Sequence, residues 1–443
     1  MAIAFSGVLK LVSEPRVLVV ASGDDLAGDL CRGLDGLGWY TLTARSVGAG
    51  EQALRDFRLD AVIIDVADGD ASLTARRLSA IAHPRHLPIL AIGDLAKDQA
   101  KGIDLVMSAP LHPVQAALRL DQLVRASLAE EEFSGRAQTF ASQGVPLATP
   151  DVDHQPLLIL TIGPADRRFL ALANALISSG AEVVAAPTPF TAFDYLHERS
   201  FDAVVLWGGP DVAAALSIVA GMKRNTRLYH IPLTLYLSQV GGSLTELFNR
   251  GVADVVDAHT REDEAADRVL ALARNHRRRK AIRMALDSVR GSAIVDAVTG
   301  LFTPELFAAH LARVADGARQ RSRPVCVCVL RIAMRNSLIE ARQTGHLQAA
   351  LPQIGAMISR LVRVEDTAAQ LSAEVFALIL PGVTADEARM AAERISAVIG
   401  CTAFEAGEGR SPFVIELDIG VGEAHRGETP AIMLERASQD LSR

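Results

Sequence analysis

The amino-acid sequence predicts an α/β protein in which two tandem doubly wound domains are followed by a third domain that mixes helices and strands. The first observation is that short, continuous apolar runs alternate with helical stretches, which is typical of a parallel sheet covered by helices on both faces. The second is that this pattern occurs twice in the same order, so that residues 57–65 are echoed by residues 200–207. A repeat of this length indicates two copies of one domain.

The expected elements follow in order along the three domains. In the first domain, residues 16–128, we expect strands at 16–20, 60–65, 87–92 and 103–107 and helices at 26–37 and 113–128. In the second domain, residues 156–273, we expect strands at 157–162, 201–206, 231–237 and 252–256. In the third domain, residues 296–443, we expect strands at 325–330, 376–380 and 414–421.

Two junctions separate these domains. Residues 129–155 are rich in Glu, Gly, Ser, Gln and Pro without a sustained apolar period, which favours a linker. Residues 274–295 contain the basic run 277–280 and then a narrow apolar stripe, which predicts a connecting helix. A solvated helix, a helical pairing seam and a basic docking surface are the three interpretations of that helix.

Composition limits the classes of function. A length of 443 residues is typical of two to four domains, and a net charge of −7 argues against nonspecific nucleic-acid binding. No apolar run approaches the roughly 18–20 residues that span a bilayer, and residues 1–12 lack the features of a signal peptide. Cys326 and Cys328 face one side of an expected strand with no further Cys or His pair nearby, which favours core packing over metal binding. We therefore expect a cytoplasmic protein with no metal site.

The first two domains resemble the receiver domains of response regulators in two-component signal transduction, which have a flavodoxin-like fold. Asp65 ends an expected strand where that family carries its phospho-acceptor. The resemblance also calls for an acidic pair after the first strand, a switch Thr or Ser, and a Lys. Those positions hold Ala21 and Ser22, Gly93, and Ala109. Asp65 is thus either a phospho-acceptor or a structural relic.

In the second copy, the acceptor position is occupied by Trp207, which cannot take a phosphoryl group, and Ala258 stands at the Lys position. The resemblance therefore implies that this copy is an interaction module. Because receiver domains commonly pair through one helical face, a homodimer built from these domains is one expected assembly.

The third domain resembles the GGDEF family of diguanylate cyclases. The segments that carry this resemblance are 296–304, 372–376, 419–421 and 434–437. The family joins two GTP molecules into cyclic di-GMP, with carboxylates holding divalent ions against the phosphates.

At the family's catalytic positions this chain has other residues. The metal-binding acidic positions fall on Arg331, Ala333 and Val375, and the signature glycines fall on Ser372 and Ala373. The positions that read the guanine base fall approximately on 339 and 340. The resemblance therefore implies a protein that is not an enzyme, with no catalytic residue, metal or cofactor.

A second family feature, the inhibitory cyclic di-GMP site, is matched by Arg363, Asp366 and Arg394. A guanidinium can bond guanine O6 and N7 together, and a carboxylate can accept from the guanine N1–H and N2–H. The alternative interpretation is that Arg363 and Asp366 are an exposed ion pair three apart on a helix.

The leading hypothesis is a noncatalytic cyclic di-GMP effector that acts through protein–protein interaction. The order receiver, receiver, GGDEF resembles regulators of cell-cycle proteolysis, and implies a protease adaptor or polar localisation proteins as partners and the cell pole as a location. The alternatives are a ligand-independent scaffold and, third, a residual diguanylate cyclase.

Overall fold

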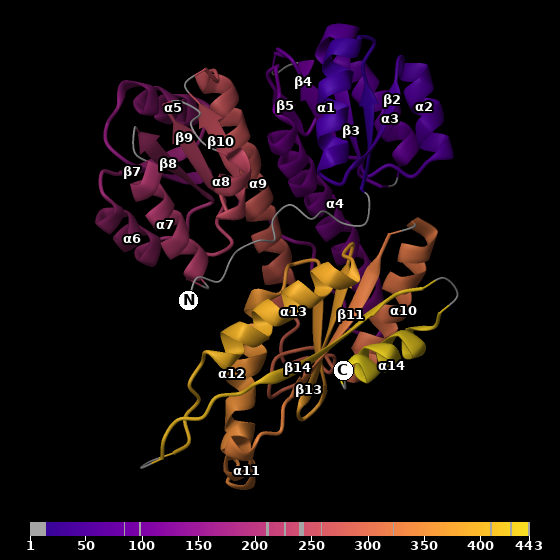
Figure 1. Cartoon of the computed structure of the whole chain (residues 1–443), viewed down its shortest axis with the longest axis vertical. Coiled ribbons are helices and arrows are strands. Elements are labelled where there is room, and N and C mark those ends of the chain that lie inside the picture. Colours follow the sequence, from indigo (N-terminus) through magenta and orange to yellow (C-terminus); the bar gives the residue numbers. More distant parts are fainter. Residues whose placement is uncertain are drawn as a thin grey trace. The chain divides into compact units, whose positions relative to one another are not determined.

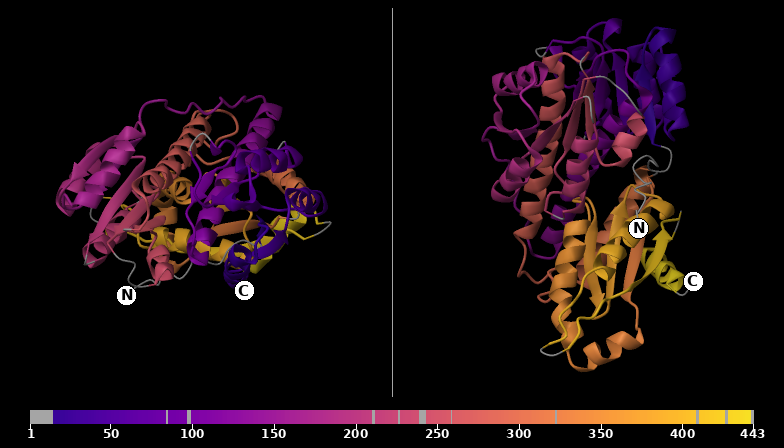
Figure 2. Two further views of the ribbon diagram at one scale, coloured as in Figure 1. Left: turned by 90° about the horizontal axis from the view of Figure 1, so that it is seen from above. Right: turned by 60° about the vertical axis from the view of Figure 1, so that its left-hand side comes forward.

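The computed structural model describes residues 15–83, 85–96, 99–209, 212–225, 227–238, 243–257, 259–321, 323–407, 410–425 and 428–441. The chain divides into two compact units. The first unit is made of Met1–Ser127 and Val152–Ala281, and the second of Leu128–Asp151 and Ile282–Arg443. Figure 1 and Figure 2 show the three sheets and the helices that flank each of them.

The first sheet lies in the first unit and has the expected doubly wound form. Its strands are β1 (Arg16–Val20), β2 (Tyr40–Ala44), β3 (Ala61–Asp65), β4 (Ile89–Ile92) and β5 (Leu105–Met107). Its helices are α1 (Asp24–Gly36), α2 (Val47–Asp56), α3 (Ala71–Ala82) and α4 (Pro113–Ser142), with the 3-10 turn η1 (Val66–Asp68) after β3. The strands pair in parallel in the order β2-β1-β3-β4-β5. Apolar residues of α1 and α4 cover one face of the sheet, and those of α2 and α3 cover the other.

The second sheet, also in the first unit, repeats this topology. Its strands are β6 (Leu158–Ile162), β7 (Glu182–Ala186), β8 (Ala203–Gly209), β9 (Leu233–Leu237) and β10 (Asp254–Asp257). Its helices are α5 (Arg167–Ser178), α6 (Pro189–Glu198), α7 (Val212–Arg224), α8 (Leu244–Asn249) and α9 (Glu262–Asp287). The strands again pair in parallel, in the order β7-β6-β8-β9-β10. The prediction of two tandem flavodoxin-like domains is confirmed.

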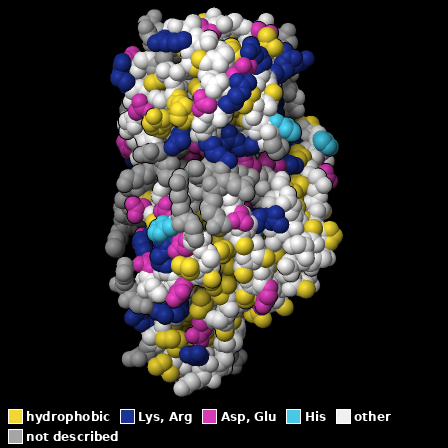
Figure 3. Space-filling model, turned by 90° about the vertical axis from the view of Figure 1, so that its right-hand side faces the viewer, with side chains coloured by type: hydrophobic (Ala, Val, Ile, Leu, Met, Phe, Trp, Pro, Cys, Tyr) yellow, Lys and Arg dark blue, Asp and Glu magenta, His cyan; other side chains and the backbone are white. Residues whose placement is uncertain are grey.

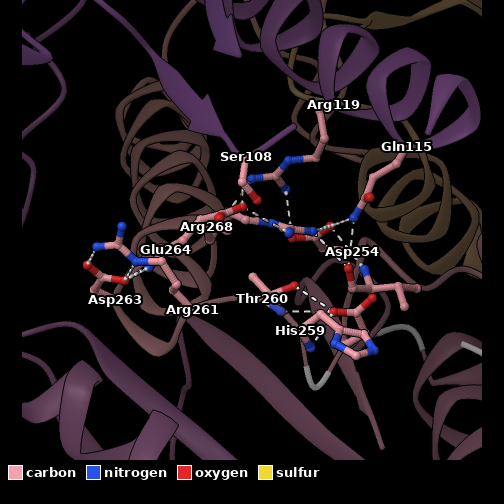
Figure 4. A network of polar contacts seen from close by, with 12 residues as sticks. Ser108, Gln115, Arg119, Asp254, His259, Thr260, Arg261, Asp263, Glu264 and Arg268 are labelled. Atoms are coloured by element: carbon pink, nitrogen blue, oxygen red, sulfur yellow. Dashed lines mark hydrogen bonds and ion pairs between the residues drawn. The ribbon is translucent and has the colours of Figure 1, made fainter. Parts of the chain in front are cut away.

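The last helices of these two sheets, α4 and α9, meet around one buried carboxylate within the first unit (Figure 4). Asp254 at the start of β10 accepts from Arg268 of α9 through both oxygens, at 2.9 and 2.6 Å. Gln115 of α4 donates to the same carboxylate at 3.1 Å, and Arg119 of α4 lies 4.0 Å from it. Because Asp254, Arg119 and Arg268 are buried, their charges are weakly screened and hold the two helices together.

The third sheet lies in the second unit and is antiparallel. Its strands are β11 (Val325–Ile332), β12 (Thr367–Ser372), β13 (Val375–Pro381) and β14 (Leu417–Glu423), in the order β12-β13-β11-β14. Its helices are α10 (Pro304–Arg321), α11 (Asn336–Gln343), α12 (His346–Leu361), α13 (Ala385–Gly400) and α14 (Pro430–Asp440). Helices α11, α12 and α13 cover one face, and α10 and α14 cover the other. Cys326 and Cys328 of β11 are both buried, as expected.

The segment predicted as a linker is helical in its first half, because α4 continues to Ser142. Its buried residues Ala129, Phe133 and Phe140 recur at helical spacing among many polar residues. Within the second unit, Ala129 and Phe133 pack on Ile282, and Phe140 packs on Val289. The apolar stripe is real but narrow, so the polar composition concealed it.

The connecting helix predicted at 274–295 is instead the second half of one long helix, α9, which ends at Asp287. One member of its basic run is engaged inside the first unit. Arg277 donates to Asp202 at 3.2 Å and to the carbonyls of Asp153 and Pro156 at 3.1 and 2.9 Å. Arg277 therefore holds the segment that leads into β6, the first strand of the second sheet, and is not part of an exposed docking surface.

Candidate functional site

Arg363 and Asp366 lie in a turn between α12 and β12, outside any helix. Helix α12 ends because its C-cap residue, Val362, has extended backbone angles (φ −73°, ψ 151°). The Arg363 backbone N–H donates to Asp366 Oδ2 at 2.8 Å, and the Asp366 N–H donates to the Arg363 carbonyl at 3.2 Å. The alternative of an exposed ion pair on a helix surface is therefore wrong, since these residues close a tight turn.

Arg394 reaches this turn from the neighbouring helix α13. Its Nη2 donates to the carbonyl of Leu361, two residues before Arg363, at 3.3 Å. Helix α13 begins with a capping box in which Thr384 and Glu387 satisfy each other's backbone N–H groups, and this fixes the start of the helix that carries Arg394. The three residues matched by the sequence thus lie around one turn.

The carboxyl group of Asp366 is less acidic than that of an ordinary aspartate. Burial and the neighbouring Glu365 raise the pKa of Asp366 to about 6, although Arg363 and Arg136 act to lower it. At neutral pH the group is ionised and can accept hydrogen bonds. A turn that carries a carboxylate and an arginine, with Arg394 bonded to the chain just before it, is suited to a ligand with adjacent N–H donors and acceptors, such as the edge of a guanine base.

Two arginines that the sequence did not single out bind this turn and the residues just before it. Arg136 of α4 donates from Nη1 to the Val364 carbonyl at 2.8 Å and from Nη2 to the Asp366 carbonyl at 2.9 Å. Arg283 of α9 donates to the carbonyls of Ser359 and Val362 at 3.2 and 3.1 Å. Their partners are backbone oxygens, which carry no sequence signal.

The signature segment forms the connection between β12 and β13, where the strand register shifts between Gln370 and Ser372. Glu374, the acidic residue retained there, is bonded to Arg342 of α11, with Oε1 at 3.0 Å from Nε. The Glu374 carbonyl also accepts from the Ile332 N–H at the end of β11, at 2.9 Å. The connection between β12 and β13 is therefore bonded to β11 and α11 within the domain.

The end of β11 presents a guanidinium group at the position where the resemblance calls for a metal-binding acid. Arg331 is bonded to Asp418 of β14 at 3.1 Å, and Ala333 is buried. Nearby, Arg335 is bonded to Glu416 at 3.0 Å. Within the described residues, no cluster of three or more His, Cys, Asp or Glu side chains is arranged to hold a metal ion.

In the first sheet, Asp65 stands at the carboxyl end of β3 as expected. Its Oδ1 accepts from the Ala67 N–H at 3.0 Å and so caps η1. Gly93 has φ +130°, and a Cβ there would lie 3.0 Å from the Cβ of Val66. Ser22 follows β1 and its N–H donates to Asp68 at 2.6 Å. Asp65 thus has a local capping role, and its phosphorylation stays a prediction.

In the second sheet, the corresponding edge is filled by aromatic side chains. Trp207 stacks on Tyr236 with ring centroids 5.2 Å apart, and the Phe169 ring lies 5.7 Å from that of Trp207. A Cβ on Gly163 would fall 2.4 Å from the Trp207 Cβ, so the backbone there requires glycine. Ala258, predicted at the Lys position, lies outside the described residues. The position that the receiver resemblance assigns to a phospho-acceptor is thus held by an aromatic cluster.

On the face shown in Figure 3, the basic and acidic side chains of the described residues are interspersed. Among the helices of the described part of the chain, none has the length and apolar character needed to cross a membrane.

Comparison with known proteins identifies one part of the chain. Residues 293–443 match the family model described as "Diguanylate cyclase, GGDEF domain". The GGDEF domain of FimX from Pseudomonas aeruginosa is 20% identical, with a TM-score of 0.31 over 34% of this chain and 92% of that chain. The GGDEF domain of DgcB from Caulobacter crescentus, solved with cyclic di-GMP, is 24% identical, with a TM-score of 0.32 over 35% of this chain and 88% of that chain. No curated protein matches the sequence.

Proposed function

We propose that this chain, which carries a GGDEF domain at residues 293–443, is a noncatalytic receptor for cyclic di-GMP that acts through protein–protein interaction. The ligand would be bound by Arg363, Asp366 and Arg394. The observation that carries the proposal is the closed turn at 363–366, beside which α13 places Arg394.

The chemistry of the turn supports this ligand. A guanidinium fork bonds the O6 and N7 acceptors of guanine, and it also stacks on purine faces and contacts phosphate. The ionised Asp366 accepts from the N1–H and N2–H of the same base. Cyclic di-GMP offers two guanines and two phosphates, so one molecule can satisfy all three side chains.

The residues at the family's catalytic positions support a receptor without synthase activity. GTP condensation needs carboxylates that hold divalent ions against phosphate oxygens. At the expected positions Arg331 brings a positive charge and Ala333 brings no ligand, while Glu374 is bonded to Arg342. A guanidinium repels a divalent cation, and an engaged carboxylate has to break an ion pair before it can bind one.

The domain order receiver-like, receiver-like, GGDEF resembles that of PopA, a cyclic di-GMP effector. The corresponding proposal is that ligand binding promotes docking to a protease adaptor or to proteins at the cell pole. The first two domains would serve as docking modules.

Titration calorimetry with cyclic di-GMP tests the receptor proposal. We expect a saturable binding heat for the wild type and at least about a tenfold weaker affinity for Arg363→Ala, because a charge-assisted bond contributes about 1.5–3 kcal/mol. No binding heat with the wild type would reject the proposal in favour of a ligand-independent scaffold.

Incubation with GTP and Mg²⁺, followed by chromatography, tests the absence of synthase activity. We expect no cyclic dinucleotide to accumulate over hours. Steady product formation that is lost on Glu374→Ala would identify the chain as a residual diguanylate cyclase.

A further inference from the structure

The turn at 363–366 is held from outside by two arginines on two different helices. We infer that Arg136 and Arg283 are positioning residues, which fix the backbone of this turn and thereby set its affinity for a guanine nucleotide. The affinity part of this inference rests on the proposed function. Neither residue belongs to a motif of the sequence.

Arg136 spans the turn with a single planar group. It is 1% exposed, and its two terminal nitrogens bond the carbonyls of Val364 and Asp366 at 2.8 and 2.9 Å. A guanidinium is rigid, so two bonds from one fork fix the separation and direction of the two carbonyls. Burial lowers the pKa of Arg136, but Glu132, Asp366 and Glu365 oppose that effect, and an arginine stays charged in proteins.

Arg283 fixes the residues just before the turn. It donates to the carbonyls of Ser359 and Val362, at 3.2 and 3.1 Å, where α12 ends. The last carbonyls of a helix have no partner within the helix, and a cation there also matches the negative end of the helix dipole. Because Arg363 directly follows Val362, the bond from Arg283 to the Val362 carbonyl also fixes the backbone position of Arg363.

The bonds of both arginines to the turn go to backbone oxygens, so they shape it without occupying the Asp366 carboxylate. The Val364 side chain supplies an apolar anchor, packed with Ala129 and Phe133 of α4 and Ile282 of α9. Arg283 thus holds the residues just before the turn, and the Val364 side chain anchors its middle. Arg136 bonds the backbone of Val364 and of Asp366, the last residue of the turn. A site preorganised in this way loses less entropy on binding.

The two helices that carry these arginines have a second role. Helix α4 begins as the last helix of the first parallel sheet, and α9 begins as the last helix of the second. Arg136 and Arg283 therefore lie on the two helices that, along the chain, follow the two receiver-like sheets.

Hydrogen–deuterium exchange of the full chain tests the positioning role without any ligand. The amides of Arg363 and Asp366 are bonded within the turn, so their exchange reports its opening. We expect Arg136→Gln to speed exchange in 362–366 at least about tenfold and Arg136→Lys to have an intermediate effect, since an ammonium cannot bond both carbonyls in a fork. Unchanged exchange in β11 and β13 shows that the domain still folds.

Arg313→Gln is the matched control. Arg313 of α10 bonds Gln138 and Thr139 of α4, the helix that carries Arg136, at 2.7 and 3.1 Å. None of its bonds among the described residues goes to a carbonyl of the turn. We expect less than about a twofold change in the exchange of 362–366 for this variant. If Arg136→Gln and Arg313→Gln give the same exchange in the turn, the positioning inference is overturned.

Binding of cyclic di-GMP separates positioning from direct contact. Arg136→Gln should both weaken binding at least about tenfold and loosen the turn, whereas Arg363→Ala should weaken binding and leave the exchange unchanged, because its backbone N–H to Asp366 remains. Wild-type affinity in Arg136→Gln would overturn the role in binding. If the wild type binds no cyclic di-GMP, the proposed function fails, while the exchange experiment still decides whether the arginines position the turn.

Discussion

Asp366 has two tasks at the residue scale, since its carboxylate closes the turn and is also proposed to accept from guanine. Its Oδ2 binds the Arg363 N–H, while burial and Glu365 raise its pKa to about 6. A buried carboxyl with a raised pKa is easier to protonate in the folded than in the unfolded chain. Its contribution to stability is therefore fully present below the unfolded pKa, near 3.8, and is lost as the pH rises through about 6. Ligand binding has the opposite pH dependence, because it needs the ionised form.

Cyclic di-GMP affinity should therefore fall as the solution is acidified below pH 6. We expect the dissociation constant to be constant between about pH 7 and 8 and to rise by up to about tenfold per pH unit below about pH 6. Asp366→Asn should bind weakly at every pH with no such transition. Calorimetric titrations of both proteins across this range measure the profile, and a wild-type affinity independent of pH would contradict the role of the ionised carboxylate.

Some of the residues around the turn could be predicted from the sequence and others could not. Arg363, Asp366 and Arg394 were predicted because a motif at fixed spacing marks their side chains. Arg136 and Arg283 were missed, because they bind carbonyl groups that every residue possesses. A buried arginine in a segment of otherwise polar composition is recognisable only once the helix and its covering surface are known.

At the scale of elements, α4 and α9 join the two parallel sheets of the first unit through a buried charged network. Burial opposes ionisation of Asp254, but Arg268 and Arg119 lower its pKa overall. Glu264 of α9 extends the network to the first sheet by accepting from the Ser108 N–H at 3.2 Å. Removing the central carboxylate would leave two buried guanidinium groups without their main counter-charge.

Asp254→Ala should therefore destabilise the first unit by about 3–5 kcal/mol. The exposed pair of Glu246 and Arg250 is the matched control, since Glu246→Ala should cost less than about 1 kcal/mol. Urea unfolding followed by tryptophan fluorescence measures both, because the two tryptophans, Trp39 and Trp207, lie in this unit. Equal unfolding midpoints for the two variants would show that the buried network does not hold the unit together.

The inner strands of the parallel sheets were predicted from the sequence, and one edge strand of each sheet was missed. Inner strands such as β3 and β8 were found because buried strands of parallel sheets are continuous apolar runs. The edge strands β2 and β7 were missed, since both are half-exposed over most of their length. Strand β12 was not among the expected strands, because Thr, Gln and Ser interrupt its apolar pattern.

For the whole molecule, the two tandem sheets and the C-terminal GGDEF domain were predictable from repeats and motif order. The segments between domains were predicted less well, because α4 continues into the predicted linker as far as Ser142. The connecting helix was expected, but not that it would be the continuation of α9, which ends at Asp287. The C-terminal parts of both helices pack on the GGDEF domain within the second unit. The proposed function of the whole molecule depends on whether the turn that these helices hold binds cyclic di-GMP.

Titration calorimetry with cyclic di-GMP on three proteins tests that claim most directly. Arg335→Ala is the charge-matched control for Arg363→Ala, since Arg335 lies in the same domain in an exposed pair with Glu416. We predict that the wild type and Arg335→Ala bind with equal affinity and that Arg363→Ala binds at least about tenfold more weakly. An absence of binding by the wild type, or equal affinities for the two arginine variants, would contradict the account.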